Sequence, residues 1–182
     1  MPIYKVIYKD KNPNYYFNGE KYKDADALHY VENYIARSRN QYEVITGGFG
    51  INLNHAVQDM ENLAIAYGKY SGLRLRHSVL SFSDEEISQM GRTKAEQLAV
   101  LKRIAWYSAA YYGSDYQVLY GIHQEPGHYH IHFLMSVINF NTGLKYAGKK
   151  SDYRRYEVYL NRFFRVYFGW HVIFVSDMSP LD

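Results

Sequence analysis

The sequence predicts an α+β fold with a largely antiparallel central sheet flanked by helices. Three observations predict it: 47% of the 182 residues are hydrophobic, two adjacent strand-like segments are joined by a tight turn, and helical segments occur between other strand-like segments. A chain of this size buries one core comfortably and two only with difficulty. We therefore expect a single domain over residues 1–182, with one active site.

Strands are expected where short runs of aliphatic, aromatic and β-branched residues occur. The segment Gln-Glu-Pro-Gly has the composition of a tight turn, so the strands on either side of it should form a hairpin. The expected strands cover residues 3–8, 73–82, 116–123, 128–139 and 171–175.

Helices are expected where hydrophobic residues recur every three or four positions. Asp24 is a suitable N-cap for the first helix, and Ser83 followed by Glu86 has the sequence of a capping box for the third. The expected helices cover residues 24–36, about 54–68, 84 to about 112, and 152–167.

The composition limits which residues can bind a metal, but it does not identify the class of partner. The chain contains no cysteine, so any metal ion must bind to His, Asp or Glu, and disulfides are excluded. The net charge of +3 neither requires nor excludes a nucleic-acid partner. The sequence has no signal-peptide core and no stretch long enough to span a membrane, so we expect a cytoplasmic protein without a membrane partner.

Four histidines lie within ten residues in the expected hairpin. Alternation along a strand places His128, His130 and His132 on one face. We expect His123 to pair with His128, which would put Gly121 opposite His130 and leave space for an ion between the strands. Neutral imidazoles are common ligands of divalent metals, so the pattern indicates a metal site rather than a solvated strand face.

Tyrosines on the first expected helix are candidate nucleophiles. A helical wheel puts Tyr30 and Tyr34 roughly opposite the apolar stripe formed by Leu28, Val31 and Ile35. A tyrosine hydroxyl can attack phosphorus when its proton is removed and a metal polarises the phosphate. Because the chain contains 21 tyrosines, the pattern alone does not choose among them.

The histidine segment resembles the relaxase, or mobilization nuclease, family of the HUH endonuclease group. That family has a His-x-Asp-x-x-x-x-His-x-His pattern, followed by a hydrophobic strand, an Asn and a Thr-Gly. Here the pattern runs from His123 through Glu125 to His130-Ile-His132, and then to Asn139 and Thr142-Gly143. Glu125 stands where the family has Asp, which keeps the carboxylate.

Two upstream segments resemble the family's other motifs. The segment Leu28-His-Tyr30-Val-Glu-Asn resembles the first, which supplies the nucleophile. The segment Arg76-His77-Ser-Val-Leu-Ser81-Phe82, with Glu85 and Glu86, resembles the second. The three motifs stand in the family's order, which makes the resemblance more specific than any one motif.

The resemblance implies an HUH-like fold and a set of residue roles. The metal ligands would be His123, His130 and His132, and the ion Mg²⁺ or Mn²⁺. Tyr30 would be the nucleophile, with Tyr34 as the alternative one helical turn away. Accessory roles would fall to His128, Glu125, His77 and Glu86, although the position of Glu86 after Ser83 favours a helix cap.

The implied reaction is site- and strand-specific nicking and rejoining of DNA by transesterification, through a 5′-phosphotyrosyl intermediate. It would serve conjugative transfer of a plasmid or mobile element. The partners would be single-stranded or hairpin DNA at an origin of transfer and accessory DNA-processing proteins. Candidate phosphate contacts, for each of which a solvated surface is the simpler interpretation, are Arg37, Arg39, Lys149, Lys150, Arg154 and Arg155.

Three other functions compete with this interpretation. A rolling-circle replication initiator shares the chemistry and differs only in the DNA that it serves. A histidine-triad nucleotide hydrolase would explain the alternating histidines from His128 to His132, but it needs no metal and leaves His123 and the tyrosine motif unexplained. A DNA-binding module without catalysis would not need the complete set of histidines.

Overall fold

A computed structural model describes residues 1–7, 26–36, 45–125 and 128–175 of the chain. Within them a six-stranded sheet has the order β2-β4-β5-β3-β1-β6, and every neighbouring pair is antiparallel except β1 and β6. This confirms the predicted α+β fold. The strands are β1 (Ile3–Ile7), β2 (Ile45–Phe49), β3 (Leu75–Ser83), β4 (Tyr116–Glu125), β5 (His128–Asn139) and β6 (Ile173–Val175); the helices are α1 (Ala27–Ala36), α2 (Ala56–Ala66), α3 (Asp84–Met90), α4 (Lys94–Gly113) and α5 (Lys150–Phe168).

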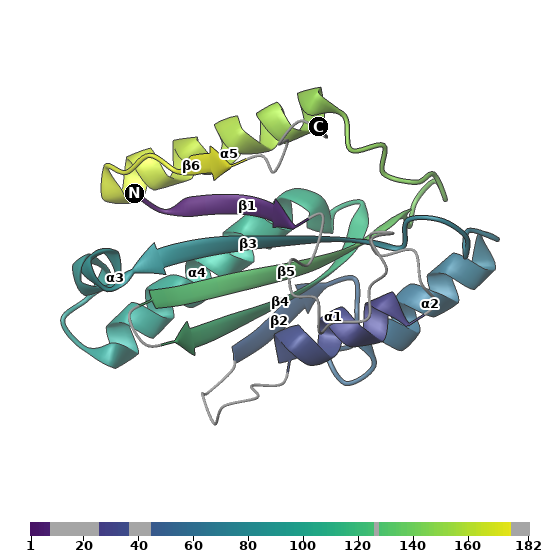
Figure 1. The fold of residues 1–182 in the computed structure, drawn as a ribbon, viewed down its shortest axis with the longest axis horizontal. Coiled ribbons are helices and arrows are strands. Elements are labelled where there is room, and N and C mark those ends of the chain that lie inside the picture. The colour runs from purple at the N-terminus through teal and green to yellow at the C-terminus, as the bar shows by residue number, and fades with distance from the viewer. Residues whose placement is uncertain (8–25, 37–44, 126–127, 176–182) are drawn as a thin grey trace, which may run out of the picture.

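Helices cover both faces of the sheet (Figure 1). On one face, α1 and α2 pack on alternate strand residues such as Leu75, Leu119 and Leu134. On the other face, α4 and α5 pack on the residues between them, such as Leu80 and Ile131. Alternation along each strand therefore divides the side chains between two cores.

The hairpin of β4 and β5 forms as predicted, but its register differs from the expected one. His123 pairs with His130, and His128 pairs with Glu125. The predicted pairing of His123 with His128 is wrong because β4 continues to Glu125. A shift of two residues keeps each side chain on its face, so the histidines still share one side of the sheet.

Gly121 makes room for a helix and not for an ion. It pairs with His132, and a Cβ atom there would lie 2.5 Å from the carbonyl oxygen of Ile35 and 2.8 Å from its Cγ2. The missing side chain lets the C-terminal end of α1 approach the backbone of β4. This close approach is the physical reason for a glycine in the middle of a strand.

Replacing Gly121 with alanine is expected to lower the free energy of unfolding by about 1–3 kcal/mol, because overpacking displaces α1. Urea unfolding of the variant measures the effect, with Gln124→Ala on the same strand as the control. A stability equal to that of the control variant would show that α1 shifts without cost.

The expected single helix from residue 84 is two helices. α3 ends at Met90, and α4 begins at Lys94 after its own capping box, in which Thr93 and Glu96 bond each other's backbone amides. The first capping box, between Ser83 and Glu86, is present as predicted. Thr93 and Glu96 are spaced as a second capping box, which is the local signal for a new helix start within the expected single helix.

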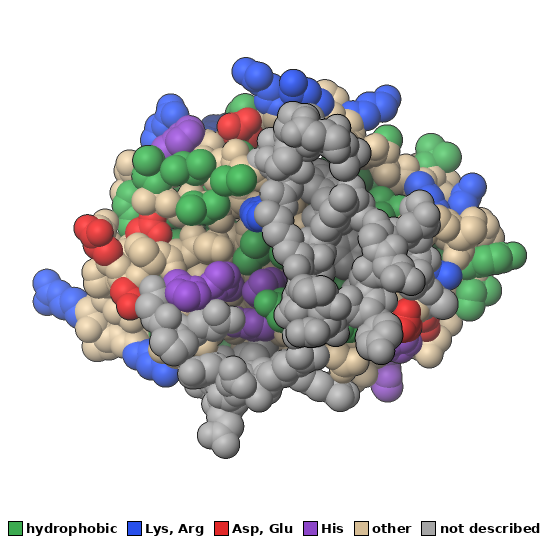
Figure 2. Space-filling view, in the orientation of Figure 1, with side chains coloured by type: hydrophobic (Ala, Val, Ile, Leu, Met, Phe, Trp, Pro, Cys, Tyr) green, Lys and Arg blue, Asp and Glu red, His purple; other side chains and the backbone are tan. Residues whose placement is uncertain are grey.

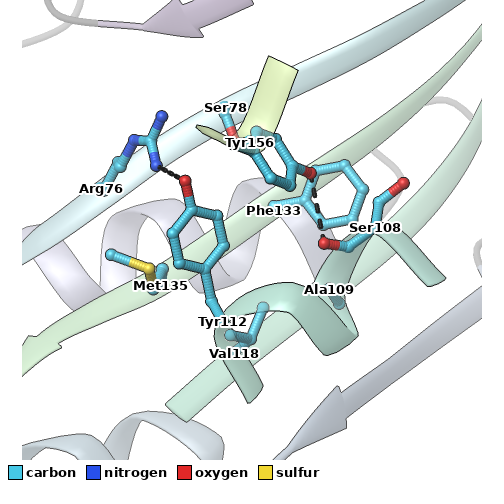
Figure 3. A pocket seen from close by; sticks show the side chains of 9 residues that line it. All are labelled: Arg76, Ser78, Ser108, Ala109, Tyr112, Val118, Phe133, Met135 and Tyr156. Atoms are coloured by element: carbon cyan, nitrogen blue, oxygen red, sulfur yellow. Dashed lines mark hydrogen bonds between the residues drawn. The ribbon is translucent and has the colours of Figure 1, made fainter. Parts of the chain in front are cut away.

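On the α4 side of the sheet, the side chains that line a small cavity leave little free space (Figure 3). Arg76 donates a hydrogen bond of 2.5 Å to the hydroxyl of Tyr112, and Tyr156 donates one of 3.2 Å to the carbonyl of Ser108. The cavity has a volume of about 10 Å³. Since one water needs roughly 10–15 Å³, the cavity is not a substrate site.

Candidate active site

Four histidines from three neighbouring strands gather on the sheet face that α1 covers. His77 lies on β3, His123 on β4, and His130 and His132 on β5. The ring of His132 is central: its centroid is 4.8 Å from that of His123, 5.5 Å from that of His77 and 5.8 Å from that of His130. In Figure 2 histidine side chains are visible near the middle of the view.

Hydrogen bonds to the Nδ1 atoms fix two of these rings. His77 Nε2 lies 3.2 Å from His132 Nδ1, and Ser81 Oγ lies 3.3 Å from His130 Nδ1. The Nε2 atom of His132 is buried and has no hydrogen-bond partner among the described residues. Each ring is thus held through one nitrogen, so that the other nitrogen can serve as a ligand, as in many metal sites.

Two histidines of the cluster favour the neutral imidazole. Burial, reinforced by the neighbouring His123, lowers the pKa of His77 to about 3. Burial also lowers the pKa of His132 well below its usual value, and His77, His123 and His130 add to the effect. A histidine must be neutral to bind a metal, so these two are in the required state at neutral pH.

The described histidines are of the type that binds a divalent metal, but their ring nitrogens do not converge on one point. Within the described ranges, no group of three His, Asp or Glu side chains is arranged to hold an ion. The geometry shows one cause: His123 Nε2 donates a 2.7 Å hydrogen bond to the carbonyl of Ile35. His123 would have to exchange this bond for a metal bond, whereas the Nε2 atom of His132 is already available.

The structure places the two candidate tyrosines differently relative to the histidines. The ring of Tyr34 lies against His132, His123 and His77, at centroid distances of 5.1, 5.8 and 6.0 Å. Tyr30 is partly buried and packs against the hydrophobic cluster between α1, α2 and the sheet. The two tyrosines are four residues apart and therefore lie on the same side of α1.

The accessory candidates have separate environments. Glu86 closes the capping box of α3 and also pairs at 2.5 Å with the amino group of Met1, so its carboxylate is used as the sequence favoured. His128 begins β5, and its ring centroid is 4.6 Å from that of His130. Glu125 ends β4, and its side chain lies outside the described part of the structure.

The basic candidates that the structure describes do not lie on the histidine face. Arg37 and Arg39 are outside the described residues. Lys149, Lys150, Arg154 and Arg155 stand at the start of α5, whose buried side chains pack in the opposite core. The described part of the chain contains no helix that is long and apolar enough to cross a membrane.

The fold and the histidine face agree with a family of DNA-processing enzymes. Residues 30–167 match the relaxase family described as the MobA/VirD2-like nuclease domain. The chain therefore belongs to this family, as the sequence motifs predicted. The matched region runs from Tyr30 through the histidines to most of α5.

Two curated relatives share part of this region. Both are named Protein rlx and come from Staphylococcus aureus: one is 27% identical over 105 residues, and the other is 24% identical over 110 residues. Each alignment covers 58% of this chain and 30% of the relative, so the matched segment is less than a third of either relative's length. No solved structure matches the chain at a significant level.

Proposed function

We propose that the protein nicks and rejoins one strand of DNA at a specific site, by metal-dependent transesterification through a 5′-phosphotyrosyl intermediate. The observation that carries the proposal is the group of closely packed histidines on β3, β4 and β5, covered by a helix with two tyrosines, in a chain of the relaxase nuclease family. The substrate would be single-stranded or hairpin DNA at an origin of transfer, in the cytoplasm. Accessory DNA-processing proteins would assist conjugative transfer.

The metal would be held by His123, His130 and His132. An Mg²⁺ or Mn²⁺ ion bound there supplies a Lewis acid that polarises the scissile phosphate. Support comes from the lowered pKa of His132 and from its buried Nε2 atom, which has no hydrogen-bond partner in the part of the chain that the structure describes. His77 and Ser81 would keep two of these rings in the correct tautomer.

Tyr30 is our proposed nucleophile, because it occupies the tyrosine position of the family's first motif. Its hydroxyl loses a proton and the oxygen forms a bond to phosphorus, while the bond from phosphorus to the 3′ oxygen breaks. The 3′ oxygen takes up a proton and becomes a free hydroxyl. Since one phosphodiester bond replaces another, the 3′ hydroxyl can later attack the phosphotyrosine and restore the strand.

Tyr34 is the competing nucleophile, and its position has a simple structural explanation in either role. Its ring packs edge-on against His132 and is 38% exposed, so it borders the site from the solvent side. If Tyr30 attacks, Tyr34 would exclude water from the histidines and contact the DNA strand. The variants compared in the Discussion separate these roles.

The proposed reaction is tested with labelled single-stranded oligonucleotides, preferably carrying the native origin, in Mn²⁺ or in a chelator. We expect a covalent protein–DNA adduct on a denaturing gel that forms only with the metal. Metal-free hydrolysis of a nucleoside phosphoramidate without any adduct would instead support the histidine-triad reaction. A rolling-circle initiator would give the same adduct and would differ in acting on a replication origin.

Ser81 offers a test of how the histidines are positioned. Removing its hydroxyl in Ser81→Ala releases Nδ1 of His130, and we expect the affinity for Mn²⁺ to fall roughly 10–100-fold. Isothermal titration calorimetry measures this affinity without DNA or turnover. Ser81→Thr, which keeps a hydroxyl, should restore most of it, and Ser88→Ala on the exposed side of α3 is the control. Unchanged affinity in Ser81→Ala would refute the positioning role.

A further inference from the structure

A shallow groove, formed by α5 and by Tyr111 of α4, lies on the side of the molecule away from the histidines. Its volume is about 560 Å³, within the roughly 300–1,000 Å³ of typical ligand sites. The residues that line it include Arg154, Arg155, Arg162, Tyr111 and Tyr159, and no carboxylate of the described chain is among them. The groove is therefore cationic and partly aromatic.

The two helices that form the groove hold more positive charge than the whole chain. Together α4 and α5 contain eight lysines and arginines and three acidic residues, an excess of five, whereas the complete chain has a net charge of +3. The rest of the chain is thus slightly acidic. Such a concentration of charge on one layer favours a polyanionic partner.

The aromatic side chains of the groove are fixed in place. Tyr159 stacks on Tyr107 at a centroid distance of 4.5 Å, and its hydroxyl donates a 3.0 Å hydrogen bond to the carbonyl of Tyr107. Tyr111 lies 4.9 Å from Tyr159, and both rings are only partly buried. Held rings beside arginines are the combination that binds unpaired bases and the phosphates between them.

The arginines of the groove differ in how available they are. Arg155 pairs with Asp152, which reduces its capacity to bind another anion. Arg154 and Arg162 are exposed on either side of Val158 along α5. In Figure 2 lysine and arginine side chains lie along the edge of the molecule where Figure 1 places α5, apart from the histidines near the middle of the view.

We propose that this groove binds single-stranded DNA outside the segment that is cleaved. Arg154 and Arg162 contact phosphates, and Tyr111 and Tyr159 receive one or two bases. This inference rests on the proposed function, because that function identifies single-stranded DNA as the substrate. Because the groove and the histidines lie on opposite faces, the strand would pass around the sheet edge, and binding there needs neither the metal nor the nucleophile.

The test is fluorescence anisotropy of a labelled thymidine oligonucleotide of about 20 nucleotides, in chelator. Arg154→Ala/Arg162→Ala should bind roughly tenfold more weakly, and the slope of log affinity against log salt should become less steep by about 0.7 for each lost phosphate contact. The control is Lys69→Ala/Arg92→Ala, which removes two exposed charges elsewhere. Equal affinities of the two double variants would overturn the proposal.

Further measurements distinguish this proposal from binding at the histidine face and from binding of another partner. An oligonucleotide with 5-iodouracil should crosslink to Tyr111 or Tyr159 under ultraviolet light, and crosslinks confined to α1 and β5 would overturn the proposal. Loss of binding to duplex DNA or to an acidic peptide, with binding to the single strand unchanged, would assign the groove to another partner. If wild-type protein forms no adduct but the double variant still loses single-strand affinity, the proposed function fails and the groove assignment stands.

Discussion

Replacing Tyr30 with phenylalanine is expected to abolish the covalent protein–DNA adduct. Removal of a nucleophile leaves only binding and electrostatic effects, so the rate should fall on the order of 10³-fold or more. The ring is kept, so packing against the cluster of α1 and α2 should be preserved. The measurement is the yield of adduct with labelled single-stranded DNA and Mn²⁺ on a denaturing gel.

Tyr34→Phe is the matched control, since it removes the same atom one turn further along α1. It should keep its adduct, with at most a moderate loss from altered DNA binding. The reverse result, with the adduct lost in Tyr34→Phe and kept in Tyr30→Phe, would transfer the role to Tyr34, whose ring touches the histidines. Adducts in both single variants but not in the double variant would mean that either tyrosine can attack.

Replacing His132 with alanine is expected to produce the second large effect. His132 is at the centre of the cluster, and its buried Nε2 atom has no hydrogen-bond partner in the described ranges. Its loss should therefore weaken Mn²⁺ binding by more than roughly 100-fold, which exceeds the effect of removing a residue that only supports a ligand. Isothermal titration calorimetry measures the loss of Mn²⁺ affinity, and the yield of protein–DNA adduct measures the loss of the reaction.

Folding must be checked for this variant, because His132 is buried. His132→Gln keeps more of the side-chain volume and should show the same loss of metal affinity, and circular dichroism should show a folded protein. His171→Ala changes an exposed histidine outside the site and is the control. Wild-type metal affinity in a folded His132→Gln protein would remove His132 from the ligand set.

The sequence predicted the elements that carry the site because their signals are local. Alternation alone placed His128, His130 and His132 on one side of β5, and helical spacing alone predicted α1 with its apolar stripe. Both signals depend only on neighbours along the chain. The roles of metal ligand and nucleophile came from the resemblance to the family motifs, because periodicity does not assign roles.

The parts that were missed depend on distant contacts or on competing local signals. β2 contains two adjacent glycines, which disfavour a strand, and it is held by pairing with β4 far along the chain. The contact of His77 with His132 requires the pairing of β3 with β5, which no local pattern specifies. The resemblance alone gave His77 an accessory role, and the structure adds its 3.2 Å hydrogen bond to His132, a proposed ligand.

The location of the histidines on β3, β4 and β5 limits how the site can adjust to a bound DNA strand. These strands are adjacent in the interior of the sheet, bonded to neighbours on both sides. Such segments open only with the cooperative unfolding of the domain, so the spacing of the imidazoles cannot relax independently. Any adjustment to the path of a bound strand must therefore come from α1 and the surface side chains, and substitutions that weaken the core would reduce the fraction of molecules with an intact site.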